Sequence, residues 1–319
     1  MGENVPIRAL SGGLVAMILL FAIAASSQTP KRNVMKQMDR ATIEGIELEY
    51  EIRGTGEPVV LIHAGVFADW FKPLLAEPAL TGRYRVLSYH RVGYAGSSRV
   101  AGPVSIAQQA AHLRSLMQRL GIERAHIVGH SSGGNIALQL ALDAPEVVGS
   151  LALLEPALVA SPSGPQKDGA AIGSTFQIGP VLQIYSAGDK AGAVDAWMRG
   201  VGGQSYRAAL DRALPGAFDQ AVADADTFFG QELPAVRQWS FTREDAIRIK
   251  QPVLAVLGAK SSEVSPVFGK RQELLLAWLP KVEAFILPDA THLLHVQNPR
   301  AMAAGLAAFF ARHPLSSSR

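Results

Sequence analysis

A single serine in this 319-residue chain has the surroundings of an activated nucleophile. Ser131 is the centre of a Gly-x-Ser-x-Gly pattern at residues 129–133. The preceding residues, 125–128, are typical of a buried strand, and residues 135–142 are typical of a helix. This pattern between a strand and a helix is the nucleophile elbow, a turn so tight that glycine is needed beside the serine. We therefore expect an exposed Ser131 hydroxyl above the edge of a sheet. A Gly/Ser helix entry capped by Ser132 is the alternative interpretation.

A serine hydroxyl is a weak nucleophile until a base accepts its proton, and the base needs a third group that fixes its tautomer. On an elbow of this kind the three groups follow along the chain in the order Ser, acid, His. His292, in the loop 288–292 after the last strand pattern, is in the position of the base. A loop histidine that caps the following helix is the alternative interpretation of His292.

Two carboxylates compete for the role of the acid. Glu155 follows the apolar run 149–154, and Glu263 follows Gly258 in a loop where Ser261 stands at the place in which an aspartate is common. We favour Glu155, because the tip of its strand points toward the same histidine and because a carboxylate at an apolar strand end is costly without a partner. Glu263 stays open as the alternative acid, or as a solvated loop residue.

An acyl-transfer site also needs two donors for the oxyanion. We expect one from the amide of Ser132 and the other from the amide of Gly65, with Val66 as its neighbour, in the loop after His63. A simple strand-ending turn is the alternative interpretation of residues 63–65.

Strand and helix patterns alternate along the chain and would bring these residues to one edge of a sheet. Continuous apolar runs of this kind suit strands that are buried on both faces of a mostly parallel sheet. In such sheets ligands bind beyond the carboxyl ends of the strands, where His63, Ser131 and Glu155 all fall. The apolar runs are residues 58–63, 84–90, 125–128, 149–154, 251–258 and 282–287.

The stretch 157–249 has a different character, because it is rich in Ala and Gly, shows helix patterns and has no strong strand pattern. We expect a helical cap inserted between two parts of one core, residues 31–156 and 250–319. The cap is expected to supply apolar walls of a substrate site, with most of its large apolar side chains packed in a small core of its own. These side chains are Phe176, Ile184, Trp197, Phe218, Phe228, Phe229 and Trp239.

Residues 1–30 are expected to lie outside the fold. They contain a basic residue, Arg8, an apolar run at 14–25 and the small-x-small sequence Ala22-Ile23-Ala24. Twelve apolar residues are short of the roughly 20 that span a bilayer core, which favours an export signal. The protein would then be periplasmic or secreted. Uncleaved, the same segment would be a membrane anchor.

The composition and charge of the chain limit the kinds of molecule that it is expected to bind. The formal net charge is +3 with both signs interspersed, and no run of Lys or Arg indicates nucleic acid. The chain has no cysteine, so disulfides and thiolate metal sites are excluded. Hydrophobic residues make up 48%, as expected for a protein with a large core.

Taken together, four segments resemble the α/β-hydrolase fold family, and the resemblance covers nearly all of the chain after the N-terminal segment. They are residues 61–65, 89–97, 129–134 and 289–295. The resemblance implies a mostly parallel central sheet with helices on both faces, and the nucleophile, base and oxyanion roles for Ser131, His292, Gly65 and Ser132.

Two departures from the family pattern stand out. The usual His-Gly pair is His63-Ala64, and the acid is missing from its common place. Some members of the haloalkane dehalogenase branch have a glutamate after the strand that follows the elbow, which is similar to Glu155. Those enzymes use an aspartate nucleophile, whereas Ser131 favours acyl chemistry.

These observations predict a serine hydrolase that acts on small-molecule esters or related acyl compounds through an acyl-enzyme, without a metal or organic cofactor. A ligand-binding or sensor protein on the same fold is the alternative from another class. C–C bond hydrolysis and cofactor-free peroxidase-like chemistry are alternatives within enzymes. A membrane contact is expected only through residues 1–30, if they are retained.

Overall fold

The computed structural model describes residues 1–2, 38–158 and 177–315. The chain divides into two units, Met1–Gln37 and Met38–Arg319, and the elements described below all belong to the second. The predicted export segment falls almost wholly on residues 3–37, outside the described residues, and stays a prediction. Within the described ranges, no helix combines the length and the hydropathy that a membrane span requires.

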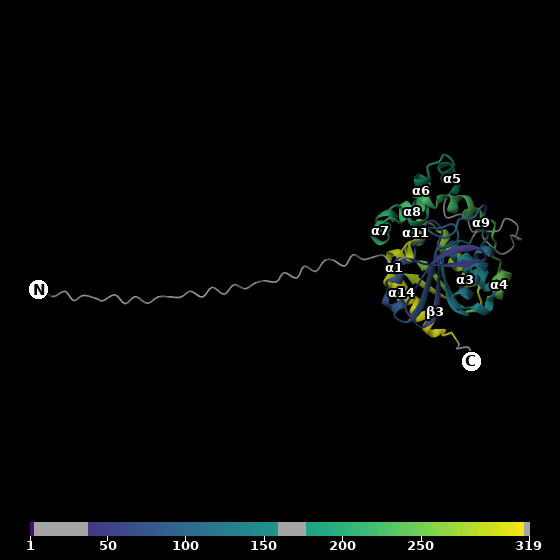
Figure 1. Ribbon diagram of the computed structural model, residues 1–319, viewed down its shortest axis with the longest axis horizontal. Helices are drawn as coiled ribbons and strands as arrows, with labels where there is room; N and C mark the ends of the chain where they lie inside the picture. The colour runs from purple at the N-terminus through teal and green to yellow at the C-terminus, as the bar shows by residue number, and fades with distance from the viewer. Residues whose placement is uncertain (3–37, 159–176, 316–319) are drawn as a thin grey trace. The chain divides into compact units, whose positions relative to one another are not determined.

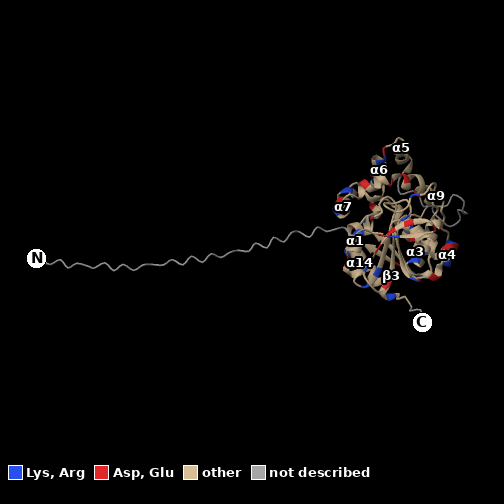
Figure 2. Cartoon of the chain, in the orientation of Figure 1, with Lys and Arg blue, Asp and Glu red and all other residues tan. Residues whose placement is uncertain are grey.

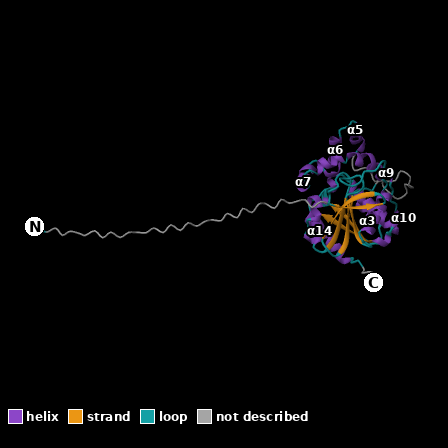
Figure 3. Ribbon diagram, in the orientation of Figure 1, coloured by secondary structure: helices purple, strands orange, loops and turns teal. Residues whose placement is uncertain are grey.

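A single mixed sheet is the centre of the second unit (Figure 3). Its strand order is β1-β2-β4-β3-β5-β6-β7-β8 among the residues described, with antiparallel pairing at β1–β2 and β2–β4 and parallel pairing from β4 to β8. The carboxyl ends of the parallel strands therefore share one edge. The strands are β1 (Asp39–Ile43), β2 (Ile46–Arg53), β3 (Glu57–Ile62), β4 (Tyr84–Tyr89), β5 (Ala125–His130), β6 (Val148–Leu154), β7 (Val253–Gly258) and β8 (Val282–Leu287).

Helices cover both faces of this sheet, as the apolar strand patterns predict. Neighbouring residues of one strand enter two separate apolar clusters, as Ile127 and Val128 of β5 do. One cluster packs under α3 (Ile106–Arg119) and α4 (Ser132–Asp143), and the other packs under α1 (Lys72–Leu75), α2 (Pro78–Thr81) and α14 (Pro299–Arg312). The short elements η1 (Pro145–Val147), α11 (Ser261–Val264) and α13 (Leu294–Gln297) and the longer α12 (Val267–Trp278) lie in the connections.

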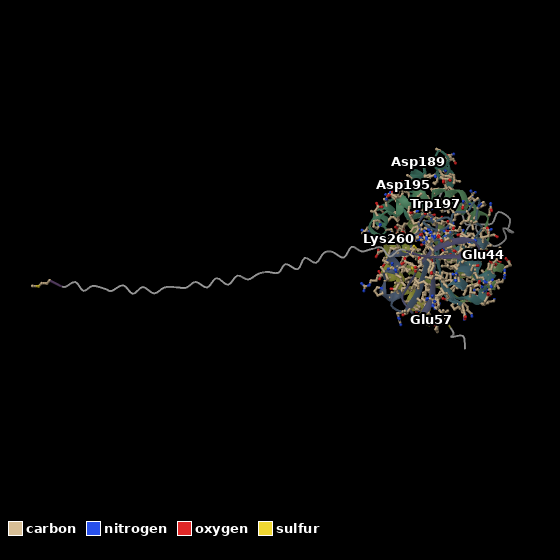
Figure 4. All side chains as sticks on the ribbon, in the orientation of Figure 1. Glu44, Glu57, Asp189, Asp195, Trp197 and Lys260 are labelled. Atoms are coloured by element: carbon tan, nitrogen blue, oxygen red, sulfur yellow. The ribbon has the colours of Figure 1, made fainter. Side chains whose placement is uncertain are left out.

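The insertion between β6 and β7 is helical, as predicted, and its helices gather beside the sheet (Figure 1). Its described part contains α5 (Ile178–Ser186), α6 (Lys190–Gly202), α7 (Tyr206–Ala213), α8 (Ala217–Ala223), the π-helix η2 (Asp226–Glu232), α9 (Leu233–Gln238) and α10 (Arg243–Arg248). Figure 4 shows Trp197 of α6 and Glu57, the first residue of β3, at opposite ends of the second unit. The insertion therefore covers the carboxyl edge of the sheet, where the predicted site residues lie.

The α/β fold with a mostly parallel sheet and a helical insertion is thus confirmed. Lys/Arg and Asp/Glu positions are mixed along the described chain (Figure 2), in keeping with the interspersed charges of the sequence. The exact cap boundaries, 157 and 249, stay a prediction, since residues 159–176 lie outside the described part.

Candidate active site

Ser131 occupies a strained turn between β5 and α4. Its backbone angles are φ 51° and ψ −118°, a left-handed value of φ that costs energy for any residue with a Cβ. The turn fits because its neighbours are glycines. A Cβ on Gly129 would lie 2.4 Å from the Gly133 carbonyl oxygen, and a Cβ on Gly133 would lie 2.2 Å from the Ile62 carbonyl oxygen. The local geometry is that of the predicted elbow.

His292 and Glu155 are in direct contact. The Nδ1 atom of His292 lies 2.6 Å from Oε2 of Glu155, and both side chains are buried. The other carboxylate oxygen of Glu155 accepts the amide N–H of Gly258 at 2.7 Å. Both carboxylate oxygens are therefore held, and the contact at Nδ1 fixes the orientation of the imidazole.

The competing carboxylate, Glu263, lies on α11 and is exposed. Ser261, at the place where an aspartate is common, is fully buried, and its hydroxyl has no partner among the described residues. Of the two acids that the sequence offers, the structure brings Glu155 to His292 and does not bring Glu263 there.

The predicted oxyanion loop meets the elbow. The amide N–H of Gly65 donates to the side-chain hydroxyl of Ser132 at 3.0 Å, a bond that the sequence did not predict. Ser132 is the first residue of α4, so its own amide has no acceptor within the helix. Both candidate donors thus lie beside Ser131, with the Gly65 amide engaged by the Ser132 hydroxyl. Val66 follows with φ 74°, a rare value for a β-branched residue.

A cavity of about 790 Å³ brings these groups together. Ser131, His292, Gly65 and Ser132 line it from the core. Of the apolar side chains predicted as walls, Trp197 and Phe228 line it from the insertion. Phe176 lies outside the described residues, and the others pack elsewhere: Ile184, Phe218, Phe229 and Trp239.

Gly65 is needed where the loop passes under the insertion. A Cβ at this position would lie 2.4 Å from the ring of Phe228. The absence of a side chain therefore lets an aromatic wall of the cavity approach the oxyanion loop.

Two buried charged residues of the cavity wall, Glu232 and Arg271, were not predicted. Glu232 accepts two hydrogen bonds of 2.9 Å from the Arg91 guanidinium and a third from the Tyr94 hydroxyl. Arg91 lies 141 positions away along the chain, so no local spacing marks the pair. Arg271 lies on α12 in the polar run Lys270-Arg271-Gln272-Glu273, which forms no recognisable motif.

Two further histidines, His130 and His295, lie near His292. The Nε2 atom of His130 lies 3.0 Å from the His292 carbonyl oxygen, and burial, together with the nearby His292 and His295, holds the pKa of His130 well below its usual value. Burial also lowers the pKa of His295 to about 3. Both rings are therefore neutral near pH 7. Among the described residues, no group of three or more His, Asp or Glu side chains could hold a metal ion.

Comparison with known families decides the classification. The alpha/beta hydrolase fold family matches residues 57–178, a region that includes β3 to β6 and the elbow. The chain has the α/β-hydrolase fold. The resemblance on which the site residues were chosen is therefore confirmed, whereas their individual roles are not tested by it.

Solved α/β-hydrolase structures superpose on nearly all of the described chain. The enol-lactonase from Burkholderia xenovorans LB400 has a TM-score of 0.70 at 23% identity and covers 86% of this chain and 100% of its own. A thermophilic esterase from Thermogutta terrifontis has a TM-score of 0.67 at 19% identity and covers 87% and 98%. A meta-cleavage product hydrolase from Pseudomonas fluorescens IP01 has a TM-score of 0.61 at 20% identity and covers 87% and 99%. At these identities the likeness shows the fold alone.

Curated relatives match over a shorter region. A dihydrolipoyllysine-residue acetyltransferase component from Cupriavidus necator is 34% identical over 165 residues, which are 49% of this chain and 44% of the relative. A putative carbamate hydrolase from Azorhizobium caulinodans is 38% identical over 109 residues, 34% of this chain and 40% of the relative. The chain thus matches less than half of the length of each relative.

Proposed function

We propose that this α/β-hydrolase cleaves small-molecule esters or related acyl compounds, with Ser131 as nucleophile, His292 as base and Glu155 as orienting acid. The observation that carries the proposal is the 2.6 Å contact between His292 and Glu155 at the wall of the cavity that Ser131 also lines. A buried acid–histidine pair beside an elbow serine is the arrangement that activates a hydroxyl for attack.

The reaction follows from these positions. His292 takes the Ser131 proton as the hydroxyl oxygen attacks the carbonyl carbon, and the amides of Ser132 and Gly65 donate to the resulting oxyanion. Because an oxyanion is a stronger acceptor than a hydroxyl, we expect it to replace the Ser132 side chain as the partner of the Gly65 amide. His292 then protonates the leaving alcohol, and a water molecule that is deprotonated by His292 hydrolyses the acyl-enzyme and restores Ser131.

Lactone hydrolysis is the same reaction on a cyclic ester, and the lactonase among the structural neighbours supports including it. C–C bond hydrolysis is the second candidate, favoured by the meta-cleavage product hydrolase among the same neighbours. A ligand-binding protein without turnover has the same fold and no acyl-enzyme, so an assay for the covalent intermediate separates it from both.

The test is covalent labelling by a fluorophosphonate probe together with hydrolysis of 4-nitrophenyl esters. Ser131→Ala should lose the label and lower kcat by about 10⁵-fold, because the nucleophile is removed from a group of residues that acts as a unit. Ser132→Ala is the matched control and should stay within about tenfold of the wild type, since it keeps the backbone amide. Full activity in Ser131→Ala would refute the proposal.

We also propose that residues 1–30 direct export of the protein to the periplasm or beyond the cell. The support is the basic, apolar and small-residue order of this segment. Intact-mass measurement of the protein recovered from the cell envelope should find a chain that begins after Ala24. A full-length chain confined to the membrane fraction would indicate an anchor instead.

A further inference from the structure

Arg271 is a buried cation in the wall of the cavity, and the described residues give it no hydrogen-bond or ion-pair partner. Its side chain projects from α12 and is 5% exposed. Its Nε atom has no hydrogen-bond partner, and the guanidinium forms no ion pair or hydrogen bond with any residue in the described ranges. A charge removed from water without compensation is expensive, so a position of this kind calls for a partner.

Arg91 shows what a compensated arginine looks like in the same protein. It is also buried, but its guanidinium donates to Gln109 at 2.6 Å and to both carboxylate oxygens of Glu232 at 2.9 Å. The fold is therefore able to supply a carboxylate partner to a buried guanidinium. Arg271 has received no such partner from the described chain.

Glu232 and Glu155, two carboxylates near the cavity, are already bonded to other groups. Glu232 is held by Arg91 and Tyr94, and Glu155 is held by His292 and the Gly258 amide. Burial lowers the pKa of Arg271 to about 10, and the charge of Glu155 opposes that shift, so the guanidinium is still charged at neutral pH.

The position of Arg271 relates it to the reacting groups. Phe268, one turn earlier on α12, stacks on the His292 ring with a centroid distance of 4.7 Å. Residues three apart on a helix share a face, so Arg271 lies on the same side of the cavity as the base. A substrate held at Ser131 would reach it within the same space of about 790 Å³.

We propose that Arg271 binds a carboxylate of the substrate, so that the substrate is an ester or lactone with a free carboxylate besides the scissile bond. This inference rests on the proposed hydrolase function. A guanidinium presents a planar fork of donors that matches both oxygens of a carboxylate, and the dry surroundings strengthen the contact. A neutral ester would enter the cavity but leave the guanidinium without a directly bonded anion.

Kinetics with matched esters test the preference. Mono-4-nitrophenyl glutarate carries the carboxylate on its acyl side and 4-carboxyphenyl pentanoate on its alcohol side, and 4-nitrophenyl and phenyl pentanoate are their neutral counterparts. The wild type should favour at least one charged ester over its neutral counterpart. Arg271→Met should lower kcat/KM for that ester about 10- to 100-fold and change the neutral ester less than about threefold.

Arg212→Met is the control for net charge, because Arg212 is exposed on α7 and does not line the cavity. It should leave the ratio of charged to neutral ester unchanged. An equal loss for both esters in Arg271→Met would make Arg271 a structural residue and overturn the proposal. So would a larger effect from Arg237→Met, the exposed arginine of the cavity wall.

A binding measurement keeps this inference separate from the proposed catalysis. Ser131→Ala, which cannot form an acyl-enzyme, should bind glutarate by calorimetry, and the additional Arg271→Met substitution should weaken that binding about 10- to 100-fold. Absence of glutarate binding, with the esterase active on neutral esters alone, would overturn the anion site and leave the hydrolase intact. Glutarate binding without any Ser131 labelling would overturn the hydrolase and leave the anion site.

Discussion

Backbone strain marks the individual residues that present the chemistry. Val66, Ser131 and Glu155 each have a positive φ, of 74°, 51° and 46°. They follow β3, β5 and β6, so at each of these strand ends the chain turns abruptly above the same edge of the sheet. Strained non-glycine residues persist only where the surrounding structure holds them, and they concentrate at functional sites. The three positions coincide with the oxyanion loop, the nucleophile and the acid of the proposed mechanism.

The choice of acid is testable at this scale. Glu155→Gln should lower kcat for ester hydrolysis by about 10⁴-fold, because an amide beside His292 Nδ1 no longer stabilises the imidazolium and can hold the wrong tautomer. Glu263→Gln, an exposed carboxylate on α11, should stay within about twofold of the wild type. Steady-state kinetics on one 4-nitrophenyl ester measures both variants. The reverse ranking would move the acid role to Glu263.

His90 gives a prediction for pH and stability. Burial opposes its protonation, but hydrogen bonds to Asp69 and Glu49, each 3.0 Å long, outweigh burial and raise the pKa of His90 above its usual 6.5. The stabilisation from charged His90 is therefore complete below about pH 6.5 and is lost as pH rises through the folded-state pKa.

Denaturant unfolding of the wild type and of His90→Asn tests this sign. The difference in free energy of unfolding between the two proteins should be larger at about pH 6 than at about pH 9. Burial raises the pKa values of Asp69 and Glu49, but their hydrogen bonds to His90 contribute to a net lowering of both values. The contribution of these two carboxylates to stability is therefore lost in acid instead. A difference that grows between pH 6 and 9 would contradict the assignment.

At the scale of elements, the sequence predicted what repeats along a strand or lies in a local motif. The apolar run 58–63 corresponds to β3, Glu57–Ile62, because a parallel strand buried on both faces is apolar at every position. The elbow was predicted equally well, because close steric contacts require its glycines. These contacts lie within a few residues along the chain and at the end of β3.

Two stretches whose sequence pattern predicts a single helix are divided in the structure. The pattern at 68–79 predicts one helix, whereas the structure has α1 and α2, each with proline in its first turn, where proline fits although it cannot continue the preceding helix. The pattern at 218–229 also predicts one helix, whereas the structure has α8 and the π-helix η2, whose wider turn is not specified by a 3.6-residue spacing.

The elbow glycines lead to a prediction for folding. Gly133→Ala should lower the free energy of unfolding by at least about 3 kcal/mol, because the new Cβ would meet backbone rather than a movable side chain. Gly179→Ala, in α5 with open space around the new Cβ, is the matched control and should stabilise by about 0.5–1 kcal/mol. Thermal and urea unfolding measure both variants, and equal stabilities would refute the steric account of the elbow.

For the molecule as a whole, the decisive contacts join distant parts of the chain, and for that reason the sequence did not reveal them. Glu232 belongs to the insertion, whereas Arg91 and Tyr94 belong to the loop after β4. The same loop reaches the oxyanion segment, since the Arg91 amide donates to Nε2 of His63 at 3.0 Å. The buried cluster of Arg91, Tyr94 and Glu232 therefore ties the cap to the core at the cavity wall.

Removing the charge of Glu232 should weaken this contact between the cap and the core. Glu232→Gln should lower the free energy of unfolding by about 3 kcal/mol, because it leaves the Arg91 charge buried without its carboxylate. The double variant Arg91→Met/Glu232→Gln should recover a large part of that loss, since no buried charge is then left uncompensated. Urea unfolding of the three proteins measures the coupling, and additive losses in the double variant would show that the pair does not act as a unit. If the two residues are coupled, their ion pair supports the cavity wall. Ester turnover should then fall in Glu232→Gln and recover in part in the double variant.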